Sequence, residues 1–172
     1  AFAQCSTAAW SSVTGTVQAI GVSTTPVGKK YEGKCGLSVN AGTSPGYVTT
    51  SAPSGENYLS ARFYFLPSDV DITSSDVVIF KARDGAKIQA RLSLRKVGGV
   101  VSLVSSYRSG GTLVENAKKI PLLPVWQGFT VSWTAGNGNG NFLLKLDGKK
   151  QIEVTNLDNG SELVNQVDLG IL

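Results

Sequence analysis

The basic residues of this sequence are concentrated in one central stretch, between positions 81 and 108. That stretch holds seven basic residues and one acidic residue, Asp84, so its formal charge is +6, whereas the whole chain of 172 residues carries +4. The basic residues are Lys81, Arg83, Lys87, Arg91, Arg95, Lys96 and Arg108. Such a local positive field attracts anionic partners: an acidic polysaccharide, a nucleic acid or a membrane surface. A solvated face that binds nothing explains the pattern equally well.

Polar residues alternate with apolar residues in two segments, Tyr58–Leu66 and Lys87–Lys96, the first with tyrosine and arginine and the second with lysine and arginine. Residues two apart on a strand share a face. Each strand would therefore carry its polar residues on one face. These residues are Tyr58, Ser60, Arg62 and Tyr64 in the first segment, and Lys87, Gln89, Arg91, Ser93 and Arg95 in the second. A tyrosine ring packs on the CH groups of a sugar, and the planar arginine fork fits a carboxylate or sulfate. Together these residue types favour an acidic glycan.

The sequence contains no histidine, which excludes Ser-His-Asp groups, Cys-His groups and His-ligated metal sites within this chain. Its two cysteines, Cys5 and Cys35, are too few for a cysteine metal site. We expect a disulfide between them that closes a loop of about 31 residues and stabilises the fold by roughly 3–4 kcal/mol. A disulfide would indicate an oxidising compartment. The alternative is two buried free thiols in a cytosolic protein.

The first three residues, Ala1-Phe2-Ala3, have the small-x-small pattern of a signal-peptidase site. We therefore expect a secreted protein, extracellular or periplasmic, in which residues 1–3 are a remnant of the export signal. Residues added in cloning would explain them as well. The sequence has no run of 18 apolar residues and predicts no membrane-spanning helix.

Strand patterns dominate the chain, and no segment has a sustained helical period. The predicted strands include Tyr58–Leu66, Val77–Ala82, Lys87–Lys96, Val100–Tyr107, Phe129–Trp133, Phe142–Leu146 and Lys150–Val154. Gly98-Gly99 and Asp147-Gly148 predict hairpin turns between neighbouring strands. Trp133 shares a face with Phe129 and Val131, which predicts a core position. The fold class is all-β: an antiparallel two-sheet sandwich in which residues 1–172 form one domain.

Several of these strands resemble the concanavalin A-like lectin and glucanase superfamily, in its laminin-G-like and bacterial secreted branches. The resemblance rests on Trp126 with Phe129–Trp133, on Phe142–Gly148, on Val167–Gly170 and on Tyr31–Leu37. It covers roughly residues 28–172 and implies a jelly-roll sandwich. Many such domains continue to a closing strand beyond the point where this chain stops, at Leu172. We expect that this strand is supplied differently, that the chain ends within a strand, or that it is part of a longer protein.

The resemblance implies that one sheet presents a concave outer face for a ligand. The residues predicted to bind there are Tyr58, Arg62, Tyr64, Lys87, Gln89, Arg91, Arg95 and Tyr107. The predicted function is a non-catalytic carbohydrate-binding module that recognises an anionic polysaccharide. A structural or adhesive extracellular domain without a small ligand is the main alternative. Nucleic acid is disfavoured as a partner, because no nucleic-acid-binding module is visible.

Catalysis is a less favoured interpretation. The glycoside hydrolases of the superfamily use a Glu-x-Asp-x-x-Glu strand motif, which brings two carboxylates together; the nearest match here is Asp69-Val70-Asp71. A polysaccharide lyase acting on a uronate polymer is the stronger enzymatic alternative, because tyrosine or lysine can serve as its base and acid. Its candidate residues are Tyr64, Tyr107, Arg62, Arg91 and Lys87.

Calcium is the cofactor that the resemblance suggests, since laminin-G-like and lectin domains often bind it through loop oxygens. Asp69, Asp71 and Asp76 lie in one predicted loop and offer hard oxygen ligands. Their spacing is not that of an EF-hand, because Thr73 stands at the third ligand position and Ser74 replaces the glycine.

Overall fold

The computed structural model describes residues 6–21, 30–32, 35–39, 44–67, 70, 72 and 75–172. In these residues the chain forms β-strands and no α-helix, so no described helix could cross a membrane. Residues 1–3 and Cys5 lie outside the described part. The export signal and the disulfide to Cys35 therefore stay predictions.

Most strands belong to two antiparallel sheets. The larger has the order β1 (Ser12–Thr14), β4 (Gly46–Glu56), β14 (Val164–Ile171), β6 (Val77–Asp84), β7 (Lys87–Val97), β8 (Val100–Ser109) and β10 (Ile120–Pro121), with β9 (Thr112–Glu115) also paired to β8. The smaller has the order β13 (Lys149–Asp158), β12 (Asn137–Leu146), β11 (Gln127–Thr134) and β5 (Tyr58–Phe65). A separate hairpin joins β2 (Val17–Gly21) and β3 (Cys35–Val39).

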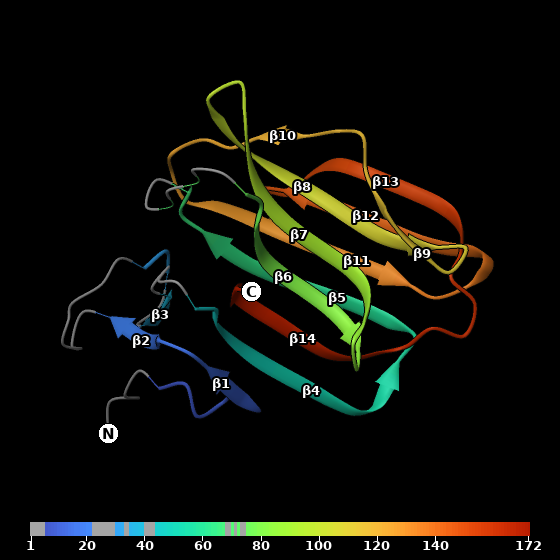
Figure 1. Cartoon of the computed structure of the whole chain (residues 1–172), viewed down its shortest axis with the longest axis horizontal. Helices are drawn as coiled ribbons and strands as arrows, with labels where there is room; N and C mark the ends of the chain where they lie inside the picture. The colour runs from blue at the N-terminus through green and yellow to red at the C-terminus, as the bar shows by residue number, and fades with distance from the viewer. Residues whose placement is uncertain are drawn as a thin grey trace.

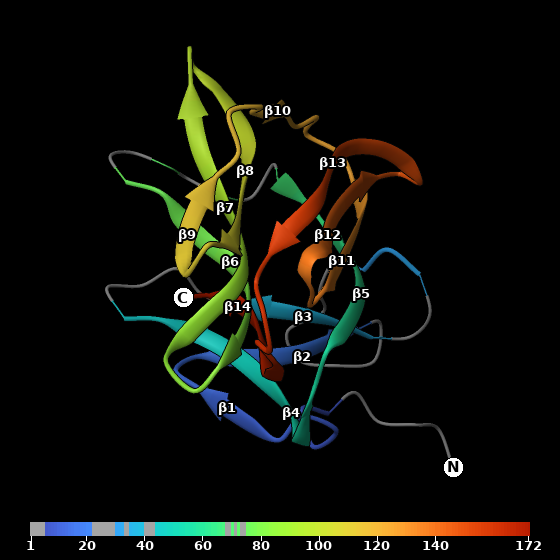
Figure 2. The same ribbon diagram turned by 90° about the vertical axis from the view of Figure 1, so that its right-hand side faces the viewer.

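The eight-stranded and four-stranded sheets lie face to face (Figures 1 and 2), as the predicted sandwich requires. Trp133, Phe129 and Phe142 fill the inner face of the four-stranded sheet and are fully buried. Phe80, Leu92 and Leu94 do the same from the other sheet. Alternation with polar residues directs these side chains inward, and the predicted core position of Trp133 is confirmed.

The two predicted hairpin turns are present. Gly98 and Gly99 connect β7 to β8 with φ of 57° and 85°. Asp147 and Gly148 connect β12 to β13 with φ of 49° and 78°. Positive φ at both central residues defines the type I′ turn, which matches the twist of the flanking strands. These turns set the strand pairing that carries the polar residues on the outer faces.

Candidate functional site

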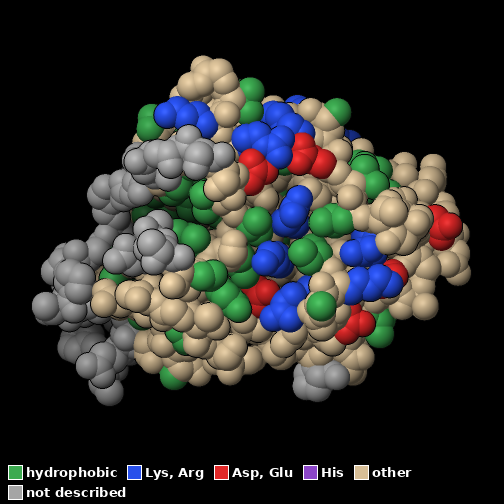
Figure 3. All heavy atoms as spheres, viewed as in Figure 1, with side chains coloured by type: hydrophobic (Ala, Val, Ile, Leu, Met, Phe, Trp, Pro, Cys, Tyr) green, Lys and Arg blue, Asp and Glu red, His purple; other side chains and the backbone are tan. Residues whose placement is uncertain are grey.

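The basic residues of positions 81–108 lie on β6, β7 and β8, in the middle of the eight-stranded sheet. Lys81 stands between the core residues Phe80 and Ala82, and Arg91 stands between Ala90 and Leu92. Because side chains alternate along a strand, Lys81 and Arg91 project from the outer face of this sheet. Figure 3 shows Lys and Arg side chains gathered there, with Asp and Glu beside them. We call this surface the basic face.

One row of directly paired residues crosses the basic face, and we call it the central row. It consists of Thr49, Asp168, Lys81, Arg91, Ser106 and Glu115, on β4, β14, β6, β7, β8 and β9. Neighbouring strands lie about 4.8 Å apart, so the ends of two long side chains in adjacent positions can reach one bound group. Lys81 and Arg91 are such neighbours.

Neither Lys81 nor Arg91 forms an ion pair with a carboxylate of the described residues, although Asp168 on the neighbouring strand attracts Lys81. In the part of the chain that the structure describes, the Lys81 ammonium forms no hydrogen bond or ion pair. Arg91 donates from Nη2 to Ser106 Oγ at 3.3 Å, and its buried Nε has no acceptor among the described residues. A buried donor without a partner is costly, and like charges opposite each other repel. A bound oxyanion would relieve the repulsion between the two cations.

The surroundings of Lys81 act on its pKa. Burial lowers the pKa of Lys81 below its ordinary value, because a half-buried ammonium loses hydration. The charge of Asp168 opposes this shift, while those of Arg83 and Arg91 add to it. An anion held between Lys81 and Arg91 would favour the charged form of Lys81.

Asp168 lies opposite Lys81 but is bound by Arg83. The residue is 2% exposed, and its carboxylate accepts hydrogen bonds from Arg83 Nε at 2.5 Å, Arg83 Nη2 at 3.2 Å and Thr49 Oγ1 at 2.8 Å. This hydrogen bonding raises the pKa of Arg83. Arg83 also donates to Gln166 Oε1 at 2.5 Å. The Arg83–Asp168 pair is therefore complete without Lys81.

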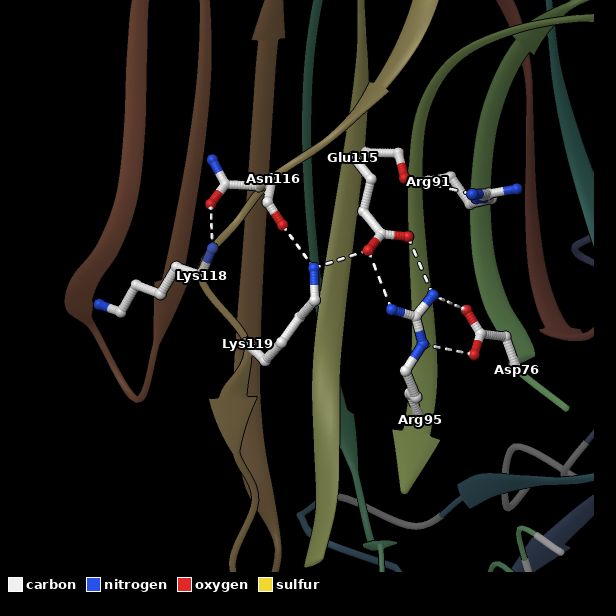
Figure 4. Close-up of polar contacts among 8 residues, drawn as sticks. Asp76, Arg91, Arg95, Glu115, Asn116, Lys118 and Lys119 are labelled. Atoms are coloured by element: carbon white, nitrogen blue, oxygen red, sulfur yellow. Dashed lines mark hydrogen bonds and ion pairs between the residues drawn. The ribbon is translucent and has the colours of Figure 1, made fainter. Parts of the chain in front are cut away.

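Arg95 holds two carboxylates at one end of the basic face (Figure 4). It donates to both oxygens of Asp76, at 2.7 and 2.6 Å, and to both oxygens of Glu115, at 2.9 Å each. Lys119 also reaches Glu115 at 2.6 Å. Hydrogen bonds from Arg95 and then Lys119 lower the pKa of Glu115 to about 2. These four residues make a balanced ion network, which we call the Arg95 network.

The Arg95 network bears on the predicted calcium site, since Asp76 is engaged with Arg95. Asp69 and Asp71 lie outside the described residues. Within the described residues, no group of three or more Asp, Glu, Cys or His side chains could hold a metal ion. The calcium site stays a prediction.

Lys87 and Gln89 lie on β7 at the other end of the face, where both bind Glu162. Lys87 forms an ion pair with Glu162, and Gln89 Nε2 donates to it at 2.9 Å. These contacts lower the pKa of Glu162, the Lys87 bond having the larger effect. Gln89, expected to be exposed, is fully buried, because a register irregularity between Ala82 and Arg83 displaces it from regular pairing.

The structure corrects the prediction that all the outward tyrosines and cations share one face. Tyr58, Arg62 and Tyr64 lie on β5 in the four-stranded sheet. They project from its outer face, on the other side of the sandwich from Arg91. There Arg62 Nη2 donates to the Tyr64 hydroxyl at 2.7 Å, and Tyr31 stacks on Tyr64 with ring centroids 3.8 Å apart. The predicted residues therefore form two separate groups.

Tyr107 does not project from either outer face. Its ring stacks on Phe142, with centroids 5.4 Å apart, and packs against the core. Tyr107 was predicted to lie with the ligand-binding residues on an outer face. The structure corrects this placement, because Tyr107 faces inward opposite Ala90. The residues named for a lyase are likewise divided between two outer faces and the core, so they do not form one active centre.

Sequence reasoning did not select Lys81, Asp168 or Ser106 as site residues. Val77–Ala82 has the appearance of a continuous apolar run, which hides the alternation that turns Lys81 outward. Counting back from the β6–β7 turn, where Asp84 pairs with Lys87, would place Lys81 opposite Ala90. The register shift moves its partner to Arg91. Asp168 lies in Val167–Gly170, a motif that the sequence analysis uses only as evidence for the end of a strand.

This arrangement defines the chain as a protein with a concanavalin A-like, lectin-like fold. The T. cruzi calreticulin globular domain is a solved structure similar to it, with a TM-score of 0.60 and 14% sequence identity. The match covers 91% of this chain and 73% of that domain. At this identity the similarity concerns the fold alone. Comparison of the sequence with protein-family models and with curated proteins found no match.

Proposed function

We propose that this chain is a non-catalytic carbohydrate-binding module that recognises an anionic polysaccharide through the basic face, outside the cytosol. We also propose that it belongs to the laminin-G-like or bacterial secreted branches of its superfamily, on the strength of the strand motifs. The observation that carries the binding proposal is the Lys81–Arg91 pair. Two adjacent cations in the middle of a sheet face form no ion pair with a carboxylate among the described residues.

The chemistry of the pair favours an oxyanion ligand. Arg91 offers its guanidinium and Lys81 an ammonium, both of which form charge-assisted hydrogen bonds with carboxylate or sulfate oxygens. Ser93, Val104 and Ser106, on the same face, are at most 2% exposed, so this part of the sheet is shielded from solvent. Shielding strengthens such bonds relative to those at an open surface.

The test is binding to a panel of neutral, uronate-containing and sulfated glycans at two salt concentrations. We expect binding to acidic glycans that weakens as salt rises. Lys81→Gln and Arg91→Gln should each weaken binding about ten- to hundredfold, since a hydrogen bond to a charged group contributes about 1.5–3 kcal/mol.

Lys96→Gln is the matched control for these variants. Lys96 is exposed beside the β7–β8 turn and alternates to the other face of the strand from Arg95, so its variant loses the same charge and should bind as the wild type does. Absence of binding to every glycan in the panel would refute the proposal and favour a structural or adhesive domain. A rise in absorbance near 235 nm on polyuronates would instead identify a lyase.

A further inference from the structure

We infer, resting on the proposed function, that the basic face takes one acidic group of a glycan rather than a run of closely spaced acidic groups. The inference follows from how the other charges around Lys81 and Arg91 are already paired. The formal charge of +6 in residues 81–108 therefore overstates the positive charge that is available to bind a ligand.

Most cations around the Lys81–Arg91 pair are engaged by acidic residues of the chain itself. Arg83 is bound to Asp168, and Lys87 is bound to Glu162. In the Arg95 network, two cations balance two carboxylates. The carboxylates that flank the pair are Asp76, Glu115, Glu162 and Asp168.

The remaining cations of positions 81–108 are Arg108 and Lys96. Arg108 donates to the backbone carbonyl oxygens of Ile88, at 2.8 Å, and Gly111, at 2.5 Å, and its charge acts on Glu162. Lys96 is turned to the other face of β7. Within the described residues, Lys81 and Arg91 are thus the two cations of this stretch on the basic face that no carboxylate or backbone carbonyl of the chain engages.

The spacing of the charges sets how many acidic groups the face can hold. Cross-strand neighbours such as Lys81 and Arg91 have Cα atoms about 4.5–5.5 Å apart, close enough to share one carboxylate or sulfate. Along β7, Arg95 and Lys87 each lie four residues from Arg91, about 13 Å away. A second acidic group on the next sugars would lie between these positions or approach the Arg95 network or the Lys87–Glu162 pair, whose cations are already engaged by carboxylates of the chain.

The ligand is therefore one oxyanion on an otherwise neutral glycan segment. A uronate carboxylate and a sulfate ester share the chemistry required, with oxygens that accept from the Arg91 guanidinium and the Lys81 ammonium. We expect the neutral sugars on either side to cover the paired ions without displacing them.

The experiment compares oligosaccharides of equal length by isothermal titration calorimetry at two salt concentrations. The probes are a neutral chain, a chain with one uronate, a chain with one sulfate and a chain with a uronate on every sugar. We expect at least one single-acid chain to bind about tenfold or more tightly than the neutral chain. The polyuronate should bind within about threefold of the single-uronate chain, with the same salt dependence.

The outcomes separate this inference from the proposed function. A polyuronate that binds about tenfold tighter than the single-uronate chain, with a steeper loss of affinity in salt, overturns the single-acid inference and leaves the proposed function standing. Equal affinities for the neutral and acidic chains, or binding by none of them, overturn both.

A gain-of-function variant provides a second, independent measurement. Asp76→Asn combined with Glu115→Gln removes the carboxylates that engage Arg95 and Lys119, so polyuronate affinity should rise about fivefold or more while single-uronate affinity stays within about twofold. The control is Glu153→Gln with Asp158→Asn on β13 in the other sheet, which makes the same change in net charge and should alter neither affinity. An equal rise in both double variants would show an effect of net charge alone and overturn the inference.

Discussion

Lys81 and Arg91 are the residues on which the proposed binding depends. Each is held on the basic face by apolar neighbours in the core, and each lacks a carboxylate partner in the described residues. The nearby Arg83–Asp168 pair shows what a completed ion pair on this sheet looks like, with a buried carboxylate and several hydrogen bonds. The Arg83–Asp168 ion pair stabilises the fold, whereas the Lys81–Arg91 pair can accept a ligand.

The lowered pKa of Lys81 leads to a pH-dependent affinity. The ammonium form binds the anion, so affinity should fall as pH rises through the lowered Lys81 pKa, below the 10.5 of an ordinary lysine. Lys81→Arg keeps its charge over this range and should keep its affinity. Titrations with a single-uronate chain between pH 7 and 11 measure both profiles. Identical profiles for wild type and Lys81→Arg would contradict the role given to the Lys81 ammonium.

Asp168→Asn should lower the stability of the fold. The change leaves Arg83 without its carboxylate and places three uncompensated cations in adjacent strands. We expect a loss of about 2–3 kcal/mol, less than for a fully buried pair because Arg83 is partly exposed. Urea unfolding with and without sulfate measures this, and sulfate should restore more stability to Asp168→Asn than to the wild type. Unchanged stability in Asp168→Asn would refute this account of Asp168.

At the level of strands, alternation and turn chemistry predict much of the fold, but the site depends on a register irregularity. The Gly98-Gly99 and Asp147-Gly148 turns and the strands around them are foreseeable, because period-2 alternation and positive-φ residues are local signals. The pairing of Lys81 with Arg91 cannot be foreseen in this way, because one extra residue in β7 shifts the register between β6 and β7. Residues from Asn137 onward, although rich in glycine and asparagine, extend β12.

The link from β7 through Arg95 to β9 should be sensitive to acid. The pKa of Glu115 is about 2, below its ordinary 4.5, so the folded state binds fewer protons than the unfolded state between these values. The stability from this link is present above about pH 4.5 and is lost as pH falls toward 2. The effect should be modest, because Glu115 is 35% exposed and its ion pairs are screened.

Glu115→Gln tests this link. Chemical unfolding measured from pH 6 down to pH 2 should give a smaller loss of stability for this variant than for the wild type. Glu153→Gln on β13 removes a carboxylate from the other sheet and should follow the wild-type profile. The account fails if Glu115→Gln loses as much stability as the wild type over that range.

For the whole molecule, the two outer faces of the sandwich have different chemistry. The four-stranded sheet carries Arg62 and the stacked Tyr31 and Tyr64, while the eight-stranded sheet carries the Lys81–Arg91 pair. Sequence alternation finds Arg62, Tyr64 and Arg91, because it assigns residues to the outside of a strand, but it does not find Lys81. It does not assign strands to sheets, which depends on long-range pairing such as β14 inserting between β4 and β6. That step separates Tyr64 from Arg91.

The most direct test of the proposed function is an NMR titration that follows arginine side chains. A single-uronate oligosaccharide is added to ¹⁵N-labelled protein, and the Nε–H signals and backbone amides are recorded. The account predicts saturable shifts of the Arg91 Nε–H signal and of the Lys81 and Ser106 amides, with the Arg62 Nε–H signal unmoved. Shifts concentrated on Arg62 and Tyr64, or no shifts at saturating ligand, would contradict it.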